Sequence, residues 1–143
     1  MQIADTKFDD DPAQARRGKG LSVALWTTQI VLAALFLFSG AMKFITPAAQ
    51  MSKQTTLPLS FIYFIGVCEM LGGVGLILPA LLRILPVLTP LAASGLVIIM
   101  LGATYVSRSM GWTAIIPFVI GLIAAFIAYG RFRLRPIQPR LQS

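Results

Sequence analysis

The sequence predicts an all-α membrane protein whose fold is a bundle of four transmembrane helices. Hydrophobic residues occupy 57% of the 143 positions and charged residues only 12%, whereas soluble domains are about 45–50% apolar and about 25% charged. The mean hydropathy is +0.81. The apolar residues form four long runs with at most one charge each, close to the roughly 20 residues that a helix needs to cross a bilayer.

These runs predict the organisation of the whole chain. Residues 1–20 mix acidic and basic side chains with few apolar ones and are expected to form a disordered cytoplasmic tail. Residues 21–130 are expected to form the transmembrane domain. The polar loop between the first two helices is expected to carry a short turn at the membrane surface. Helices are predicted over 22–45, 59–78, 87–106 and 112–130, followed by a basic, exposed cytoplasmic tail over 131–143.

The distribution of basic residues predicts the orientation. Nine of the 12 Lys and Arg lie in the two tails and in the short turn at Arg83, whereas Lys43, Lys53 and Arg108 lie on the opposite side. Short loops rich in Lys and Arg stay in the cytoplasm. We therefore expect both termini in the cytoplasm, in a multi-pass protein of the cell inner (cytoplasmic) membrane with the lipid bilayer as a partner.

Composition also excludes several classes of function. The net charge is +7, but the basic residues flank apolar runs rather than cluster with aromatic ones, so no nucleic-acid partner is predicted. The chain has one cysteine, Cys68, and no histidine. An intramolecular disulfide, a histidine-ligated haem or a zinc cluster therefore cannot be built from this chain alone. We predict no catalytic residue and no metal site.

Glu69 is the residue that most needs explanation. It is the only acidic residue beyond the N-terminal tail and lies midway along an apolar run. A charge near the bilayer centre costs about 2.5–3.5 kcal/mol or more, so Glu69 must be paired, protonated or facing a polar cavity. Gly66, Gly72 and Gly73 lie at helical spacing from it, which favours close approach of another helix. The alternative is that glycines on two faces of this helix leave room for a ligand groove.

Lys43, on the preceding antiparallel helix, is the simplest counter-ion. Glu69 lies roughly 15 Å below the outer end of its helix at 1.5 Å per residue. Lys43, in contrast, lies within about one turn of the outer end of the preceding helix. Depth alone favours a neutral carboxyl in a ligand, quinone or proton site, with the ion pair as the alternative. Cys68 points about 100° away from Glu69 around the helix, so the two need not share a site. The candidate site residues are Glu69, Lys43, Gly66, Gly72 and Gly73.

Three segments, LFLFSGAMKF, YFIGVCEMLGGVGLILP and LTPLAASGLVIIMLGA, resemble the DoxX-like family of small four-helix membrane proteins. The resemblance covers about residues 25–130. It implies the four-helix architecture first, and second an accessory or membrane-anchor subunit linked to quinone or thiol redox metabolism. The family takes its name from a subunit of an archaeal thiosulfate:quinone oxidoreductase. Its marks in this chain are Gly40 with Lys43, Gly66 with Glu69, Pro79, and Gly102 with Ala103.

Other functions stay open at this point. Glu69 could serve a small proton-coupled carrier component, and the packed helix surfaces could serve a structural or assembly factor. The chain is not expected to be catalytic alone, and any activity is expected in an oxidoreductase complex. Quinone is the one cofactor left open. A membrane or redox protein partner and a homo-oligomer are the protein partners left open.

Overall fold

A computed structural model describes residues 12–85, 87–134 and 137. These residues form helices and no strand, which confirms the predicted all-α class. The bounds are α1 (Pro12–Ile45), α2 (Ala48–Gln54), α3 (Leu59–Leu82), α4 (Leu88–Ser107), the 3-10 helix η1 (Arg108–Ala114), α5 (Ile115–Tyr129) and the π-helical η2 (Gly130–Leu134). The short α2 occupies the loop in which a turn was expected.

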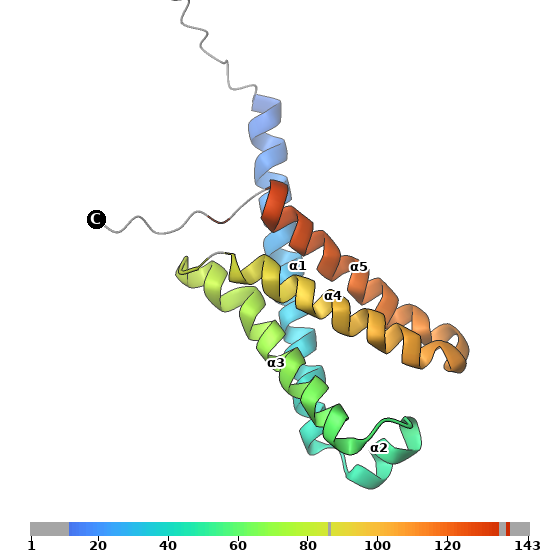
Figure 1. Cartoon of the computed structure of the whole chain (residues 1–143). Coiled ribbons are helices and arrows are strands. Elements are labelled where there is room, and N and C mark those ends of the chain that lie inside the picture. Colours follow the sequence, from blue (N-terminus) through green and yellow to red (C-terminus); the bar gives the residue numbers. More distant parts are fainter. Residues whose placement is uncertain (1–11, 86, 135–136, 138–143) are drawn as a thin grey trace, which may run out of the picture.

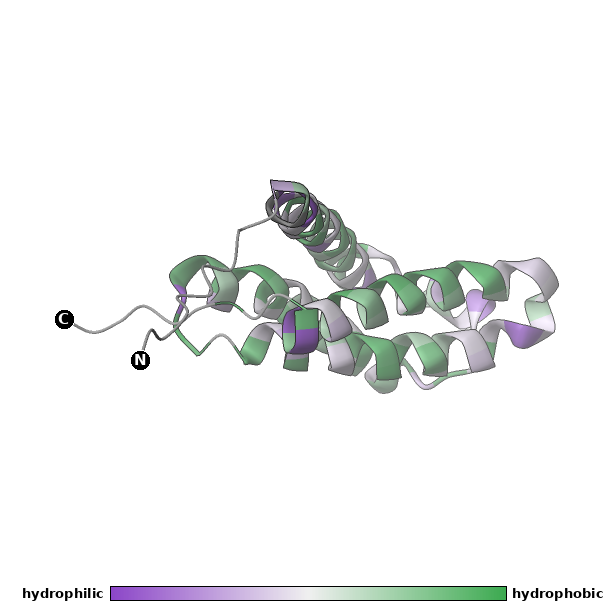
Figure 2. Ribbon diagram, turned by 90° about the horizontal axis from the view of Figure 1, so that it is seen from above, coloured by the Kyte–Doolittle hydropathy of each residue, from purple (hydrophilic) through white to green (hydrophobic). Residues whose placement is uncertain are grey.

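Three helical stretches among the described residues are long and apolar enough to cross a membrane: Arg16–Ile45, Leu59–Leu82 and Leu88–Leu134. The third is bent at Gly111, whose φ of 69° lies in the left-handed region that glycine adopts readily. On either side of this bend, α4 and α5 pack against each other. Most of the ribbon along the packed helices is coloured as hydrophobic (Figure 2). The chain is therefore a membrane protein whose helices contact lipid.

The helices associate as two pairs. In Figure 1, α1 lies beside α3, and α4 lies beside α5; contacts also join α3 to α4 and α1 to α5. The two pairs meet at the end of the bundle where α5 ends, and they diverge toward α2 and η1. The buried apolar core fills the region where the pairs meet. It consists of Leu32, Ala33, Phe36, Leu76, Ala93, Leu96, Met100, Ala124, Ile127 and Ala128.

Glycines on α3 let its neighbours approach almost to backbone contact. A Cβ added at Gly73 would lie 3.0 Å from the carbonyl oxygen of Ala33 on α1, and one added at Gly72 would lie 2.6 Å from the Leu96 side chain on α4. Packing through small residues is the usual way that membrane helices associate. The alternative prediction of a ligand groove at these glycines is wrong, because α1 and α4 fill the space beside them.

The start of the first predicted helix and the end of the second differ from the structure. Helix α1 begins at Pro12 rather than at 22, so part of the predicted tail over 1–20 is helical, while residues 1–11 lie outside the described residues. Proline is favoured in the first turn of a helix, and Arg, Lys and Ala extend one readily. Helix α3 passes through Pro79, because proline removes a single helix hydrogen bond and membrane helices tolerate it. It ends at Leu82, and the following Arg83 is in the left-handed conformation.

The C-terminal side also differs from its prediction. Helix α5 starts at Ile115 rather than at 112, because residues before it form η1. The segment from 131 was predicted to be exposed, yet Arg131 is buried within η2. Its burial follows from packing of η2 against the middle of α1, at Leu25 and Gln29, which no local pattern reveals. Residues 135–136 and 138–143 of this predicted tail lie outside the described residues.

Candidate functional site

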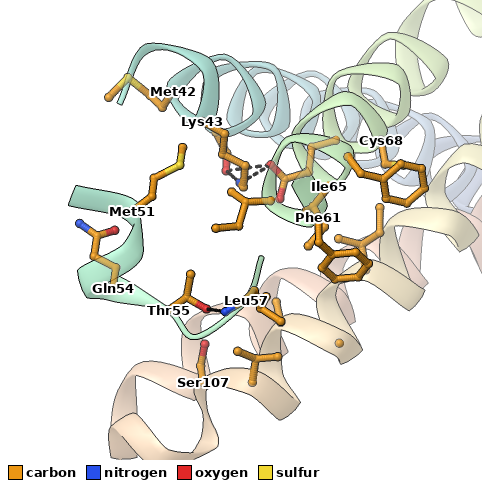
Figure 3. Close-up of a pocket in the computed structure, with 18 of the residues that line it drawn as sticks. Met42, Lys43, Met51, Gln54, Thr55, Leu57, Phe61, Ile65, Cys68 and Ser107 are labelled. Carbon is orange, nitrogen blue, oxygen red and sulfur yellow. Dashed lines mark hydrogen bonds and ion pairs between the residues drawn. The ribbon is translucent and has the colours of Figure 1, made fainter. Parts of the chain in front are cut away.

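Contact between α1 and α3 brings Lys43 to Glu69. The Lys43 Nζ lies 2.6 Å from the Glu69 Oε2. Ser39, one turn before Lys43, donates its hydroxyl to the same carboxylate oxygen at 3.1 Å and accepts a hydrogen bond from Lys43 Nζ at 3.2 Å. The three side chains form a polar cluster in which the cation and the anion neutralise each other. Dashed lines beside Lys43 mark these interactions in Figure 3.

Two glycines explain why this pair forms. A Cβ added at Gly40 would lie 2.7 Å from the carbonyl oxygen of Gly66, and one added at Gly66 would lie 3.3 Å from the Cβ of Lys43. Lys43 is thus level with Gly66, and Glu69 lies one turn further along the same face of α3. The sequence signal for this contact is the pairing of Gly40 and Lys43 on α1 with Gly66 and Glu69 on α3.

Of the two alternatives for Glu69, the structure has the ion pair with Lys43, and the depth argument that favoured a neutral carboxyl is wrong. It assumed that α1 and α3 end at the same depth. Because Lys43 is level with Gly66, α3 extends about 7–8 Å beyond the end of α1 at 1.5 Å per residue. The flexible lysine stem covers the remaining distance.

The pair keeps unused hydrogen-bonding capacity. Glu69 has a 5% exposed side chain, and its second oxygen, Oε1, has no hydrogen-bond partner among the described residues. Lys43 is 24% exposed and uses two of its three N–H donors, on Ser39 and on Glu69. One donor and one acceptor therefore remain for a further molecule.

A cavity of about 910 Å³ lies beside the pair, where α1 and α3 diverge from α4. Lys43, Glu69 and Cys68 all contribute to its wall, so the prediction that Cys68 and Glu69 need not share a site gives way to a common cavity. Figure 3 shows Lys43 and Cys68 at this wall and Met51 on α2 across from them. Most of the remaining lining is apolar, and includes Met42, Phe61, Ile65, Ile98, Tyr105 and Met110.

The predicted site residues divide into two groups. Lys43 and Glu69 line the cavity, whereas Gly66, Gly72 and Gly73 lie at helix contacts and only position α3. Sequence reasoning missed Ser39, although its place one turn before Lys43 was a usable signal. It also missed the part of α4 that faces the cavity. There Gly102 lines the wall, and a Cβ added to it would meet nothing within 4 Å.

Comparison with known proteins gives one family match. The profile of the DoxX-like family matches residues 27–129. This range includes Lys43, Glu69 and every other residue that lines the cavity. No significant match is found among curated proteins or solved structures.

Proposed function

Because the chain belongs to the DoxX-like family, we propose that it is an accessory or membrane-anchor subunit that holds a quinone in the cavity beside Lys43 and Glu69. The observation that carries this proposal is a charge-balanced, hydrogen-bonding pair on the wall of a large apolar cavity. Ligand sites typically combine mostly apolar walls with a few oriented polar groups.

The proposed topology is a four-span protein of the inner membrane with both termini in the cytoplasm. The stretch Leu88–Leu134 would cross the membrane twice, because its two helices pack together on either side of the bend at Gly111. The excess of Lys and Arg in the tails and near Arg83 supports this orientation. The cavity would then open near the outer surface, on the side of α2 and η1.

The residues present fit a quinone. A quinone presents carbonyl acceptors on a flat apolar ring, and Lys43 has an N–H donor free beside aromatic and methionine side chains. Quinone supplies reversible two-electron chemistry when bound. In this chain Lys43 would orient the ring, and Glu69, with Oε1 unpartnered among the described residues, would hold or release a proton at the cavity wall. Electrons would have to come from a partner protein.

The native Cys68 allows a direct test, because it is the only cysteine in the chain and lines the cavity. The full chain is purified in mild detergent, and the rate of Cys68 alkylation by N-ethylmaleimide is measured with and without decylubiquinone. We expect saturating quinone to slow alkylation about five-fold or more. Decanol, which has a similar chain but no ring carbonyls, should protect weakly. Equal protection by decanol would show that the cavity accepts any apolar chain.

Two glycines on α4 provide matched variants. Neither Gly95 nor Gly102 has any atom within 4 Å of an added Cβ, but only Gly102 lines the cavity. Both substitutions, Gly102→Leu and Gly95→Leu, replace helical glycine with a better helix former, so both variants should fold. We expect protection by decylubiquinone to vanish in Gly102→Leu and to persist in Gly95→Leu. Loss of protection in both variants would contradict quinone binding in this cavity.

A proton-coupled carrier is the second candidate function, favoured by the unpartnered Oε1 of Glu69 among the described residues. A carboxylate that faces a cavity can take up a proton or a cationic group. In liposomes containing the protein, a carrier would move a solute in response to an imposed pH gradient, and Glu69→Gln would abolish this movement. A quinone-holding subunit should show quinone protection of Cys68 and no such movement.

A further inference from the structure

A second buried charge lies at the end of the bundle opposite the cavity. Arg131, in η2, is only 5% exposed. The preceding Gly130 explains its position, because a Cβ added there would lie 2.6 Å from the Leu25 side chain on α1. This close approach presses η2 against α1. The guanidinium carbon of Arg131 lies 5.1 Å from the centre of the Trp26 ring, a cation–π contact.

Among the described residues, Arg131 uses one of its five guanidinium N–H donors. Its Nε donates to the Oε1 of Gln29 at 3.0 Å, and Gln29 in turn donates its amide to the Leu76 carbonyl of α3. The buried Nη2 has no hydrogen-bond partner, and no hydrogen bond from Nη1 is found in the part of the chain that the structure describes. Both terminal nitrogens therefore keep donors that no described group accepts, and because Nη2 is enclosed by protein, Nη1 is the one that a further molecule would reach.

The charge of Arg131 is also unbalanced among the described residues. Glu69 is the only carboxylate side chain within residues 12–134, and it is paired with Lys43 at the other end of the bundle. A neutral amide and an indole ring compensate a buried cation only in part. Exposed Arg133 and Arg83 add positive charge at the same end. An anion is the group that would satisfy both the donors and the charge.

We propose that the Nη1 group of the Arg131 guanidinium binds the phosphate of a membrane phospholipid. Nη1 carries two N–H donors on a positively charged group, and a phosphate supplies both the acceptor oxygens and the negative charge that would satisfy them. The site lies where the last apolar run ends, next to Trp26 and Tyr129, and such rings typically lie at headgroup depth. Helix α4 also contacts η2, and the buried Thr89 hydroxyl in the first turn of α4 has no hydrogen-bond partner among the described residues.

The first experiment compares headgroups on the unaltered protein. The full chain is stripped of lipid in mild detergent, and its melting temperature and retained lipid are measured by thermal unfolding and native mass spectrometry. We expect phosphatidylglycerol to remain bound and to raise the melting temperature by several degrees. Diacylglycerol with the same acyl chains, which lacks phosphate, should do neither. An equal effect of diacylglycerol would overturn the proposal, and so would an equal effect of inorganic phosphate at the same concentration.

Two arginines in η2 provide matched variants, because Arg131 is buried and Arg133 is exposed. Arg131→Gln and Arg133→Gln remove the same charge from the same helix. We expect Arg131→Gln to weaken phosphatidylglycerol binding about ten-fold and Arg133→Gln to change it less than about three-fold. Equal losses would mean that only the overall positive charge attracts lipid. If Arg131→Gln does not fold, Arg131→Lys replaces it. Wild-type affinity in Arg131→Lys would overturn the role of the guanidinium group.

The acidic residues near the start of the chain are the alternative source of an anion. A variant with Asp5, Asp9, Asp10 and Asp11 all changed to Asn tests this source. We expect its phosphatidylglycerol affinity to stay within about two-fold of the unaltered chain. A ten-fold gain would show that the chain's own carboxylates occupy Arg131, which would overturn the lipid proposal. Because Cys68 alkylation is measured at the opposite end, failure of the quinone test leaves this result unaffected.

Discussion

Lys43 and Arg131 are basic residues at opposite ends of the same bundle, and their surroundings differ. Lys43 lies 2.6 Å from a carboxylate beside a large cavity, whereas Arg131 lies against a neutral amide and an indole ring. A balanced ion pair adds no net charge to its cavity and so suits a neutral molecule with hydrogen-bonding groups. An unbalanced guanidinium favours an anion. The difference in charge balance distinguishes the ligands proposed for the two ends.

Packing around the two cations differs as well. Near Arg131, Gly130 contacts Leu25 and the helix pairs meet, so η2 is pressed onto α1. Near Lys43, only α1 and α3 are in close contact, through Gly40 and Gly66, while α4 diverges. We therefore expect the Lys43 end to accept a bulky molecule within the bundle. The Arg131 end should accept only a headgroup at its edge.

The largest expected effect on stability comes from breaking the ion pair. Lys43→Met leaves the buried Glu69 carboxylate without its cation and should lower the free energy of unfolding by about 3–5 kcal/mol. Glu69→Gln should cost only about 1–2 kcal/mol, because the partly exposed Lys43 can extend toward the headgroups. The double variant should recover about 2 kcal/mol relative to the sum of the single changes. Unfolding in mixed detergent micelles measures all three, and strictly additive losses would contradict a direct pair.

Next in size is the glycine contact that positions the pair. Gly40→Ala puts a methyl group 2.7 Å from a backbone carbonyl on α3, so the helices must separate, at a cost of about 2–3 kcal/mol. The matched change Gly95→Ala, at an open position on α4, should stabilise the protein by about 1 kcal/mol through helix propensity. Both follow from the same unfolding measurement. A Gly40→Ala variant as stable as the parent would mean that α1 and α3 do not approach this closely.

A smaller effect is expected at the other end, from Gln29. Gln29→Leu removes the acceptor of Arg131 Nε and the amide donor to Leu76, and should cost about 1–2 kcal/mol. Thr28→Val is the control. The Thr28 hydroxyl bonds only to the Ala24 carbonyl of its own helix, and its loss should change stability by less than about 0.5 kcal/mol. Equal effects of the two changes would remove Gln29 as the link between α1, α3 and η2.

The smallest effect on stability is expected from single cysteines at exposed positions, which show by labelling on which side of the membrane each end of the bundle lies. In a Cys68→Ala background, single cysteines replace exposed Ser52, Ser109 or Ile84. An impermeant thiol reagent added to intact cells should label positions 52 and 109, near the cavity, and spare position 84, near the Arg131 end. Labelling of position 84 alone would invert the proposed orientation. Opposite labelling of positions 52 and 109 would contradict the proposed double crossing of Leu88–Leu134.

The sequence by itself determined that this is an all-helical membrane protein and that Glu69 is its most constrained residue. Both conclusions rest on local properties, since hydropathy and the scarcity of charge can be read along a single run. The family motifs, which pair Gly40 with Lys43 and Gly66 with Glu69, carried the candidate site as well. The residues at which helices bend or end were less predictable, because packing overrides local preference. An example is α3, which continues through Pro79.

Only the tertiary structure decided how far Lys43 reaches, which helices enclose the cavity and that Arg131 is buried. Each depends on the offset or divergence of helices distant in the sequence. The depth of a residue, estimated by counting residues from the end of its own helix, does not show that α3 extends beyond α1. A basic residue after an apolar run is usually exposed, and Arg131 departs from this rule because Gly130 lets η2 contact Leu25, far away in the chain. Such contacts are set by long-range packing, which local composition does not encode.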